Sequence, residues 1–272
     1  MTNLVERLFS CIREKRRQVV VIGDVMVDRW IDGRMEQCQD GCPKFVQEKV
    51  TDTPGGAANA ERCLSGWGVA TSLYGYALND CPIKYRYVED SRIVFRADDD
   101  GEATRSSGYK WAHQLGLEMV GHAGAVLLSD YDKGFLTPEF IREIARICME
   151  RCIPCIADVK RESSIYQGCI LKANSDWYIR YGHADVVTRG KDSPLLDELI
   201  QVRYLPTVRC VNHVGAGDCF AAHLTLALAY GFSLDESAVL AHSAGRVYVQ
   251  SPYNRPPLPA EIAEDLSSTV ST

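Results

Sequence analysis

The sequence predicts an α/β fold in three layers, α/β/α, with a mostly parallel central sheet and a small β-lid. Short apolar, β-branched runs alternate with segments of helical periodicity, which is typical of parallel βαβ units. The 272 residues suit one large α/β domain, and 46% of them are hydrophobic, enough to bury a sizeable core. Two further stretches alternate with period two. We therefore expect residues 1–272 to form a single domain from which two β excursions emerge.

Five runs carry the expected parallel strands. Each is short and rich in aliphatic or β-branched residues, as are strands that are buried on both faces. The predicted strands are Val19–Ile22, Ala125–Ser129, Ile153–Ala157, Ile170–Ala173 and Val186–Thr188.

Three of the expected helices can be placed from the sequence. Thr137 is suited to cap a helix that begins at Pro138, because threonine accepts from helix-terminal N–H groups and proline suits the first helical position. Two later helices are expected from about Asp218 to Tyr230 and from about Leu234 to Val249.

The lid is expected from residues about 30–53 and 84–97, which break the βα rhythm. Their side chains alternate between apolar and polar with period two, and this alternation predicts short antiparallel strands standing off the main sheet.

The composition limits the classes of partner. The net charge is −6 and the isoelectric point is near 5.6, so nothing indicates an electrostatic grip on nucleic acid or an anionic membrane. No apolar run approaches the roughly 20 residues that span a bilayer. The first residues, MTNLVERLFSCIREKRRQ, lack the pattern of a secretory signal. We therefore expect a soluble, cytoplasmic protein that binds a small molecule.

The eleven cysteines are expected to be reduced thiols. Cys148, Cys152 and Cys155 have the C-x3-C-x2-C spacing of some iron–sulfur sites. Here, however, the spacing runs from a helix end through a proline into an apolar strand, whereas such motifs occupy loops. Buried thiols are the favoured interpretation, for these three and for Cys38 and Cys42.

Four polar residues each follow the end of a predicted strand: Asp24, Asp130, Asp158 and Asn174. Any one of them alone is most simply a turn-forming residue. In an open parallel sheet the carboxyl ends of the strands lie at one edge, where ligands bind. Four such residues at one edge indicate a binding site.

The run Gly215, Ala216, Gly217 and Asp218 leads directly into a predicted helix. Glycines allow close backbone approach, and a helix start presents free N–H groups that hold anions. One interpretation makes Asp218 an acidic residue that stabilises its own helix. The other makes it a general base beside an anion hole.

A second glycine pair, Gly55 and Gly56, is followed by Asn59 at the start of another helix. One interpretation is a turn and a tightly packed helix. The alternative is that the glycines admit a polyol and Asn59 binds its hydroxyl groups.

Taken in order, the motifs VIGDVMVD, PGGAAN, SDYDKG, LKAN, VVTRG and VGAGD resemble the ribokinase-like (PfkB) carbohydrate kinases over nearly the whole chain. The stretch DRWIDG…CPKFVQEKVTDTPGGAAN is similar to the kinase domain of bacterial heptose-phosphate kinase/adenylyltransferases. The resemblance implies a ribokinase-like fold and ATP-dependent phosphorylation of a sugar or sugar-phosphate with Mg²⁺. It also implies a homodimer that pairs through the lid, where strand edges need covering.

The resemblance also implies a role for each matching residue. Asp218 would deprotonate the attacking hydroxyl, and the backbone of Gly215, Ala216 and Gly217 would form the anion hole. The sugar would be held by Asp24, Asp28, Gly55, Gly56 and Asn59. Lys84, Arg86 and Lys133 would face phosphate on the substrate side, although solvated lysines and arginines are the plain alternative. The nucleotide side would comprise Asn174, Thr188, Gly190, Asp158 and Lys160, with Asn174 organising magnesium.

Three departures distinguish the chain from that family. Trp177 stands where the N-x-x-E element has glutamate, and Asp176 is expected to point elsewhere because a helix turns about 100° per residue. The chain passes from Gly75 almost directly to Cys81, so the sheet is expected to be one or two strands short. Arg161 replaces a glycine and is expected either to crowd the nucleotide or to shift its loop.

Two other functions therefore stay open beside an active carbohydrate kinase. One is a non-catalytic sugar- or nucleotide-binding protein on the kinase scaffold. The other is a nucleoside kinase of the same superfamily.

Overall fold

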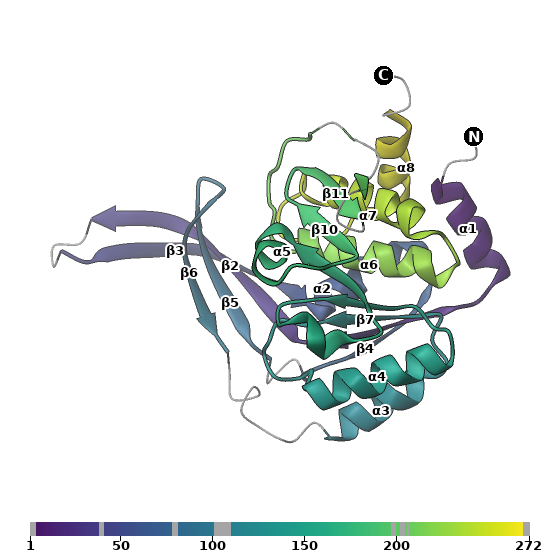
Figure 1. Ribbon diagram of the computed structural model, residues 1–272. Coiled ribbons are helices and arrows are strands. Elements are labelled where there is room, and N and C mark those ends of the chain that lie inside the picture. Colours follow the sequence, from purple (N-terminus) through teal and green to yellow (C-terminus); the bar gives the residue numbers. More distant parts are fainter. Residues whose placement is uncertain are drawn as a thin grey trace.

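The computed structural model describes residues 4–37, 41–77, 81–100, 110–196, 200–201, 205 and 207–268. Within these ranges the strands form two sheets, one of eight strands in the body of the molecule and one of four strands that projects from it (Figure 1).

The central sheet is mostly parallel. The strands from β10 to β4 run parallel to their neighbours, and β11 and β12 are antiparallel additions at one edge. The sheet ends at β4 among the described residues. In spatial order the strands are β12 (Ile200–Gln201), β11 (Asp192–Leu196), β10 (Val186–Arg189), β9 (Ile170–Asn174), β8 (Cys155–Asp158), β7 (Ala125–Ser129), β1 (Gln18–Gly23) and β4 (Ala70–Tyr74).

Helices cover both faces of this sheet, and the predicted three-layer α/β/α fold is confirmed (Figure 1). α3 (Lys110–Val120) and α4 (Pro138–Glu150) lie on one face. α6 (Ala216–Ala229) packs on the other face, next to α2 (Ala57–Arg62). The remaining helices are α1 (Leu4–Glu14), α7 (Leu234–Tyr248) and α8 (Pro259–Ser268), which pack outside α6, α5 (Ser175–Tyr181), and the short 3₁₀ helices Ser65–Trp67 and Ser163–Tyr166.

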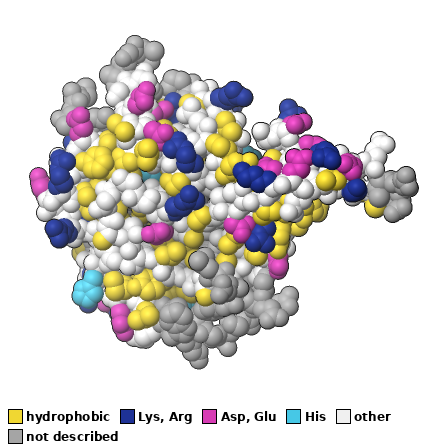
Figure 2. All heavy atoms as spheres, turned by 180° about the vertical axis from the view of Figure 1, so that it is seen from behind, with side chains coloured by type: hydrophobic (Ala, Val, Ile, Leu, Met, Phe, Trp, Pro, Cys, Tyr) yellow, Lys and Arg dark blue, Asp and Glu magenta, His cyan; other side chains and the backbone are white. Residues whose placement is uncertain are grey.

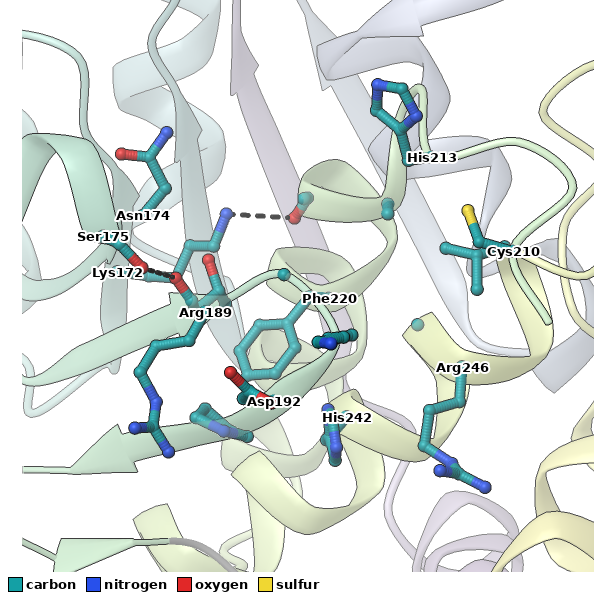
Figure 3. A pocket seen from close by; sticks show the side chains of 18 of the residues that line it. Lys172, Asn174, Ser175, Arg189, Asp192, Cys210, His213, Phe220, His242 and Arg246 are labelled. Carbon is teal, nitrogen blue, oxygen red and sulfur yellow. Dashed lines mark hydrogen bonds between the residues drawn. The ribbon is translucent and has the colours of Figure 1, made fainter. Parts of the chain in front are cut away.

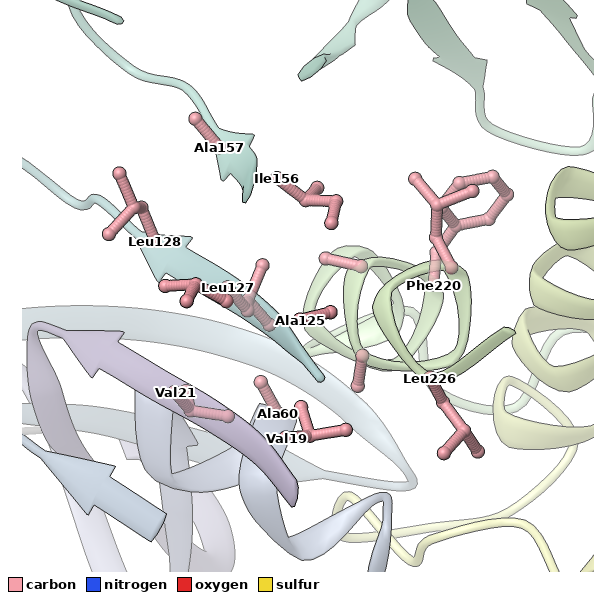
Figure 4. Packing of buried hydrophobic residues seen from close by; sticks show 14 of the residues in the cluster. Val19, Val21, Ala60, Ala125, Leu127, Leu128, Ile156, Ala157, Phe220 and Leu226 are labelled. Carbon is pink, nitrogen blue, oxygen red and sulfur yellow. The ribbon is translucent and has the colours of Figure 1, made fainter. Parts of the chain in front are cut away.

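The core lies between the sheet and α6. Val19 and Val21 of β1, Leu127 of β7 and Ile156 of β8 are fully buried, and α6 contributes Phe220 to the same cluster (Figure 4). These strands are buried on both faces, which is why they appear in the sequence as continuous apolar runs. The core therefore fixes the β1, β7 and β8 ends and the first turn of α6 relative to one another.

In the body of the molecule, the predicted strands and helices begin and end within two residues of those in the structure. Thr137 caps α4, its hydroxyl accepting from the Phe140 N–H at 3.2 Å. The strand expected at Ile153–Ala157 begins two residues later. The reason is that the Ile153 N–H donates to the Cys148 carbonyl at 2.9 Å, which makes Ile153 part of the turn that ends α4.

The second sheet contains the segments expected to form a lid, 30–53 and 84–97, but it begins nearer the core. The first strand starts at Val25, where Val25 and Met26 are buried. Because Val25 and Met26 are both buried, apolar and polar residues do not alternate there. The alternation that predicts a strand therefore begins only at Trp30. In spatial order the strands are β3 (Pro43–Gly56), β2 (Val25–Gln37), β5 (Ile83–Glu89) and β6 (Arg92–Asp99). The outer pairs are antiparallel as expected, but β2 and β5 run parallel, so the expectation of antiparallel strands was wrong for the middle pair.

The projecting sheet is largely exposed and carries neighbouring charges of opposite sign. Arg29 pairs with Asp52, and Arg34 pairs with Glu48, while hydrophobic side chains remain uncovered beside them (Figure 2). Among the residues that the structure describes, no helix is both long enough and apolar enough to cross a membrane.

Candidate active site

The first turn of α6 depends on a glycine. Gly215 precedes the helix with φ of 80°, a left-handed conformation that side chains disfavour. A Cβ there would also collide with the Tyr248 hydroxyl and lie 2.5 Å from Asn59 Nδ2. The Ala216 N–H donates to the His213 carbonyl at 3.2 Å. The Ala216 N–H therefore already has an acceptor. Of the N–H groups expected to form the anion hole, this one is not free to bind an anion.

Asp218 is held by one donor on each carboxylate oxygen. The Tyr131 hydroxyl donates to Oδ1 at 2.6 Å, and Asn59 Nδ2 donates to Oδ2 at 3.0 Å. Asn59 is fixed in turn by the Tyr248 hydroxyl at 3.1 Å. The structure thus brings Asp218 and Asn59 together as sequence reasoning expected, although Asn59 contacts the acidic residue directly.

Asp218 is 3% exposed. Burial raises its pKa from 3.8 to about 6, against the opposing effects of the Tyr131 and Asn59 hydrogen bonds and the charge of Lys172. The group is therefore ionised at neutral pH and is a much stronger proton acceptor than an ordinary aspartate, as a general base requires.

A cavity of ≈ 570 Å³ lies beside the start of α6 (Figure 3). Its size is in the range of small-molecule sites. Polar and cationic side chains lie on the β9 and β10 side, and Phe220 and His242 come from the helices. The lining residues that bear on function are Lys160, Lys172, Asn174, Asp176, Thr188, Gly190, Gly217, Phe220 and His242.

Four of the five residues expected on the nucleotide side line this cavity: Asn174, Thr188, Gly190 and Lys160. Asp158 is not among the lining residues. It is 2% exposed, and its Oδ1 accepts from Lys172 Nζ at 3.1 Å.

The N-x-x-E departure has a structural explanation. Asn174 caps α5, its Oδ1 accepting from the Trp177 N–H at 2.8 Å. The Trp177 ring is buried, and its indole N–H donates to the Arg161 carbonyl at 2.9 Å. Asp176 is among the residues that line the cavity, whereas Trp177 is not. The turn after Asn174 places Asp176 at the cavity and uses Trp177 for packing.

Arg161 does not line the cavity. Its guanidinium forms an ion pair with Asp130 and donates to the Leu136 carbonyl at 2.6 Å. The Tyr166 hydroxyl donates to the same Asp130 carboxylate at 2.6 Å. Arg161 therefore does not crowd the cavity. It holds a loop through Asp130 and the Leu136 carbonyl.

Asp24 does not face a ligand as expected. It is 0% exposed, and its carboxylate accepts three backbone N–H groups, from Tyr131 at 2.7 Å, Lys133 at 3.1 Å and Phe135 at 3.3 Å. Burial raises its pKa to about 6 despite these hydrogen bonds. Asp24 therefore anchors the loop that carries Tyr131. Together with Asp130 and Asp158, this makes three of the four polar residues at the strand ends structural supports.

Asp28 is also occupied. Its Oδ1 pairs with Arg86 at 2.6 Å, and its Oδ2 accepts from Asn254 Nδ2 at 3.0 Å. A Cβ on Gly55 would lie 2.9 Å from the same carboxylate, and a Cβ on Gly56 would collide with the Asp24 carbonyl. The two glycines thus allow the Asp28 carboxylate and the Asp24 carbonyl to approach closely. This agrees with the interpretation of a turn and a tightly packed helix.

The expected phosphate-facing cations surround Tyr131 and the lid. Lys84 Nζ lies 4.4 Å from the centre of the Tyr131 ring, and Lys160 Nζ lies 5.0 Å from it. Burial lowers the pKa of Lys84. Lys133 forms an ion pair with Asp100. Lys84 and Lys160 therefore converge on the residue that binds Asp218, and Arg86 and Lys133 have acidic partners.

The ten cysteines that the structure describes are free thiols, but they are not all buried as the favoured interpretation expected. Cys148 and Cys155 are buried, whereas Cys152 and Cys42 are exposed. Cys38 lies outside the described residues. Among the side chains that the structure describes, no group of three or more His, Cys, Asp or Glu is arranged to hold a metal ion.

Three residues of the site were missed by sequence reasoning. Lys172 lies at the cavity, Tyr131 binds Asp218, and His242 lines the far side with Nε2 buried and unpartnered among the described groups. Burial lowers the pKa of His242 to about 4, so its ring is neutral at neutral pH. The one available signal was Lys172 itself, a charged residue inside an apolar strand.

The chain matches one family over a part of its length. The profile of the family described as pfkB family carbohydrate kinase matches residues 180–261, which include α6 and α7. The bifunctional protein HldE of Hyphomonas neptunium is 26% identical over 296 residues, covering 87% of this chain and 61% of the relative. That of Caulobacter vibrioides is 28% identical over 292 residues, covering 86% and 60%. The chain thus spans about 60% of the length of these curated relatives.

Solved structures show the same fold at low identity. Ribokinase of Arabidopsis thaliana, complexed with ribose and ATP, superposes with a TM-score of 0.68 at 17% identity, covering 93% of this chain and 99% of that one. Phosphofructokinase-2 from Escherichia coli, in complex with potassium, superposes with a TM-score of 0.67 at 15% identity, covering 94% and 100%. The chain is therefore similar in sequence to the pfkB family carbohydrate kinases and has the ribokinase-like fold.

Proposed function

We propose that the chain is an ATP-dependent carbohydrate kinase that transfers the γ-phosphoryl group to a hydroxyl of a sugar or sugar-phosphate. The observation that carries the proposal is the position of Asp218. It is a buried carboxylate with a raised pKa, one residue from Gly217, which lines the ≈ 570 Å³ cavity. A base adjacent to a cavity at a helix start is the arrangement that phosphoryl transfer to a hydroxyl needs.

ATP fits the cavity in size and charge. Lys160, Arg189 and Lys191 line it and complement phosphates, and Phe220 supplies apolar surface. At neutral pH ionised Asp218 accepts the proton of the attacking hydroxyl. The hydroxyl oxygen then bonds to the γ-phosphorus as the bond to the β-phosphate oxygen breaks.

Magnesium fits this site as a companion of the phosphates. Mg²⁺ keeps several waters and usually takes one or two protein carboxylates plus substrate phosphates, so it needs no cage of protein ligands. Asn174 and Asp176 are two of the oxygen-bearing residues at the cavity and would hold it there. When bound, the ion would neutralise phosphate charge.

A heptose- or hexose-phosphate is the proposed acceptor class. Lys84 and Arg86 are buried near Asp218 and Asp28, so the acceptor side carries positive charge as well as carboxylates. The stretch DRWIDG…CPKFVQEKVTDTPGGAAN, which resembles that of heptose-phosphate kinases, favours the heptose branch of this class.

A catalytically impaired binding protein on the same scaffold is the second candidate. It is favoured because the carboxylates of the site already have partners within the protein. The Tyr131 hydroxyl donates to Asp218, and Arg86 forms an ion pair with Asp28. Trp177 in place of glutamate supports the same candidate.

An ADP-release assay over sugars, sugar-phosphates and nucleosides, with and without Mg²⁺, separates the candidates. Turnover that is lost in Asp218→Asn and kept in Asp235→Asn, an exposed aspartate of α7, supports the kinase. Saturable sugar or ATP binding without turnover in the wild type supports the binding protein.

The proposed assembly is a homodimer through the projecting sheet. Phe45, Tyr87 and Phe95 form a row of rings with centroid distances of 5.1 and 5.5 Å. Phe95 is 59% exposed and Met35 is 40% exposed. A second copy would cover this apolar row, which a monomer leaves in water.

A further inference from the structure

Lys172 places a cation against the first turn of α6. The residue lies on β9 and is 2% exposed. Its Nζ donates to Asp158 Oδ1 at 3.1 Å and to the Gly217 carbonyl at 3.2 Å, and Figure 3 shows the side chain directed to the helix start. A Cβ on Gly217 would lie 3.1 Å from this Nζ. The ammonium therefore borders the space that glycine leaves open.

An ammonium has three donors, and the two acceptors found among the described residues leave one N–H for another group. Lys172 lines the cavity, whereas its partner Asp158 does not. A ligand in the cavity is thus the available acceptor for the third N–H.

Two lysines and two carboxylates meet at this point, since the charge of Lys172 also acts on Asp218. Lys160 Nζ also lies 3.7 Å from Asp158 Oδ1, so two lysines share one carboxylate. A buried ion pair is costly to desolvate, and packing alone is served equally well by apolar residues of similar size. Lys160 and Lys172 both line the cavity, so an anion bound there would face two cationic side chains.

We infer that Lys172 is a catalytic residue that contacts the transferred phosphoryl group, with Asp158 as its positioning residue. The inference rests on the proposed kinase function. As the acceptor oxygen bonds to the γ-phosphorus and the bond to the β-phosphate oxygen breaks, the proton passes to Asp218. Lys172 donates to the phosphoryl oxygens, where charge is spread in the transition state. It supplies a donor that the occupied Ala216 N–H cannot.

The test compares Lys172→Met, Lys172→Arg and the exposed control Lys15→Met. Removing one donor to a developing anion lowers kcat by roughly 10²- to 10³-fold in comparable sites. We expect this loss in Lys172→Met with KM for ATP changed by less than about threefold, because the contact belongs to the transition state. Lys172→Arg is expected to recover part of the rate, and the control to match the wild type.

A second readout needs no turnover. Aluminium fluoride mimics the planar phosphoryl group, so ADP with acceptor sugar should bind more tightly in its presence. We expect that tightening in the wild type and its loss in Lys172→Met, measured by calorimetry. If Lys172→Met is too unstable, Lys172→Met/Asp158→Asn removes both charges and is expected to lose the tightening as well.

Normal kcat and normal tightening in a folded Lys172→Met variant would overturn the inference and leave the kinase function intact. Absence of fluoride tightening in a wild type that turns over would also overturn it. A wild type without turnover in which tightening depends on Lys172 would reject the kinase function while supporting Lys172 as the phosphoryl contact.

Discussion

The Tyr131 hydroxyl lies 2.6 Å from Oδ1 of Asp218, and the backbone N–H of the same tyrosine lies 2.7 Å from Oδ2 of Asp24. One residue therefore joins the base of the proposed reaction to the carboxylate that anchors its loop. An acceptor hydroxyl that approaches Asp218 must share a carboxylate oxygen with this phenol or with Asn59, or displace one of them.

Tyr131→Phe is predicted to shift the acid limb of the kcat/KM profile. Asp218 must be ionised to act, so activity falls as pH drops through its pKa of about 6. The Tyr131 hydrogen bond lowers that pKa, and its loss is expected to move the limb upward by about 1 pH unit. The measurement is kcat/KM from pH 5 to 9.

Tyr166→Phe is the matched control, since it removes a buried tyrosine–aspartate hydrogen bond at Asp130 instead. An acid limb that stays in place in Tyr131→Phe would show that the phenol does not tune Asp218.

Asp218→Asn is predicted to stabilise the protein at neutral pH while abolishing turnover. The folded-state pKa of about 6 lies above the ordinary value of 3.8, so the native state binds the proton more tightly than the unfolded state. Wild-type stability therefore falls as pH rises from about 4 to 6. The difference between these two pKa values corresponds to about 3 kcal/mol, so a gain in unfolding free energy of about 1–3 kcal/mol is expected.

Urea unfolding at pH 7.5 and pH 5 checks this sign. The gain of Asp218→Asn should be larger at pH 7.5, and Asp235→Asn should show no comparable pH dependence. A variant less stable than the wild type at pH 7.5 would mean that the ionised carboxylate is favourably solvated in the fold.

Asp24→Ala is predicted to destabilise the fold by about 3–5 kcal/mol, because three buried N–H groups lose their acceptor. Asp24→Asn should cost less, since its carbonyl oxygen can keep the two bonds now made by Oδ2. Unfolding free energy by urea titration is the measurement. If Asp24→Ala kept the stability of the wild type and raised the KM for the sugar, Asp24 would bind the sugar as first expected.

Phe95→Asp is predicted to weaken self-association. The side chain is 59% exposed within the row of rings on the projecting sheet, and a carboxylate there opposes burial by a second copy. Sedimentation velocity over a range of concentrations is the measurement. Ile179→Asp, at an 82% exposed residue of α5, is the control and should behave as the wild type. A wild type that is monomeric at high concentration removes the dimer.

The fold was largely predictable because its signals are local. The buried run Val19–Ile22 and the cap at Thr137 each specify an element from neighbouring residues. The boundary at Ile153 was missed because a backbone bond back to Cys148 decides it. Val25 and Met26 hid the start of the second sheet, because burial on both sides removes the alternation that marks a strand.

The site was predictable in position and less so in the roles of its residues. Strand ends and the glycines at Gly215 and Gly217 specify where the helix start and cavity lie. Whether Asp24 faces a ligand or three backbone N–H groups depends on the path of the loop from residue 131 to 135, which the sequence does not encode locally. Tyr131 and Lys172 reach Asp218 and Gly217 across long sequence separations, so no spacing reveals them.

The projecting sheet enters the body without a flexible connection. β1 ends at Gly23 and β2 begins at Val25, while β3 ends at Gly56 and α2 begins at Ala57. The Ala57 N–H donates to the Asp24 carbonyl at 3.0 Å, which ties the two entry points together. Asn59, the partner of Asp218, is three residues beyond Gly56. A tilt of the long hairpin would therefore displace the start of α2 and with it Asn59, the hydrogen-bond partner of the proposed base.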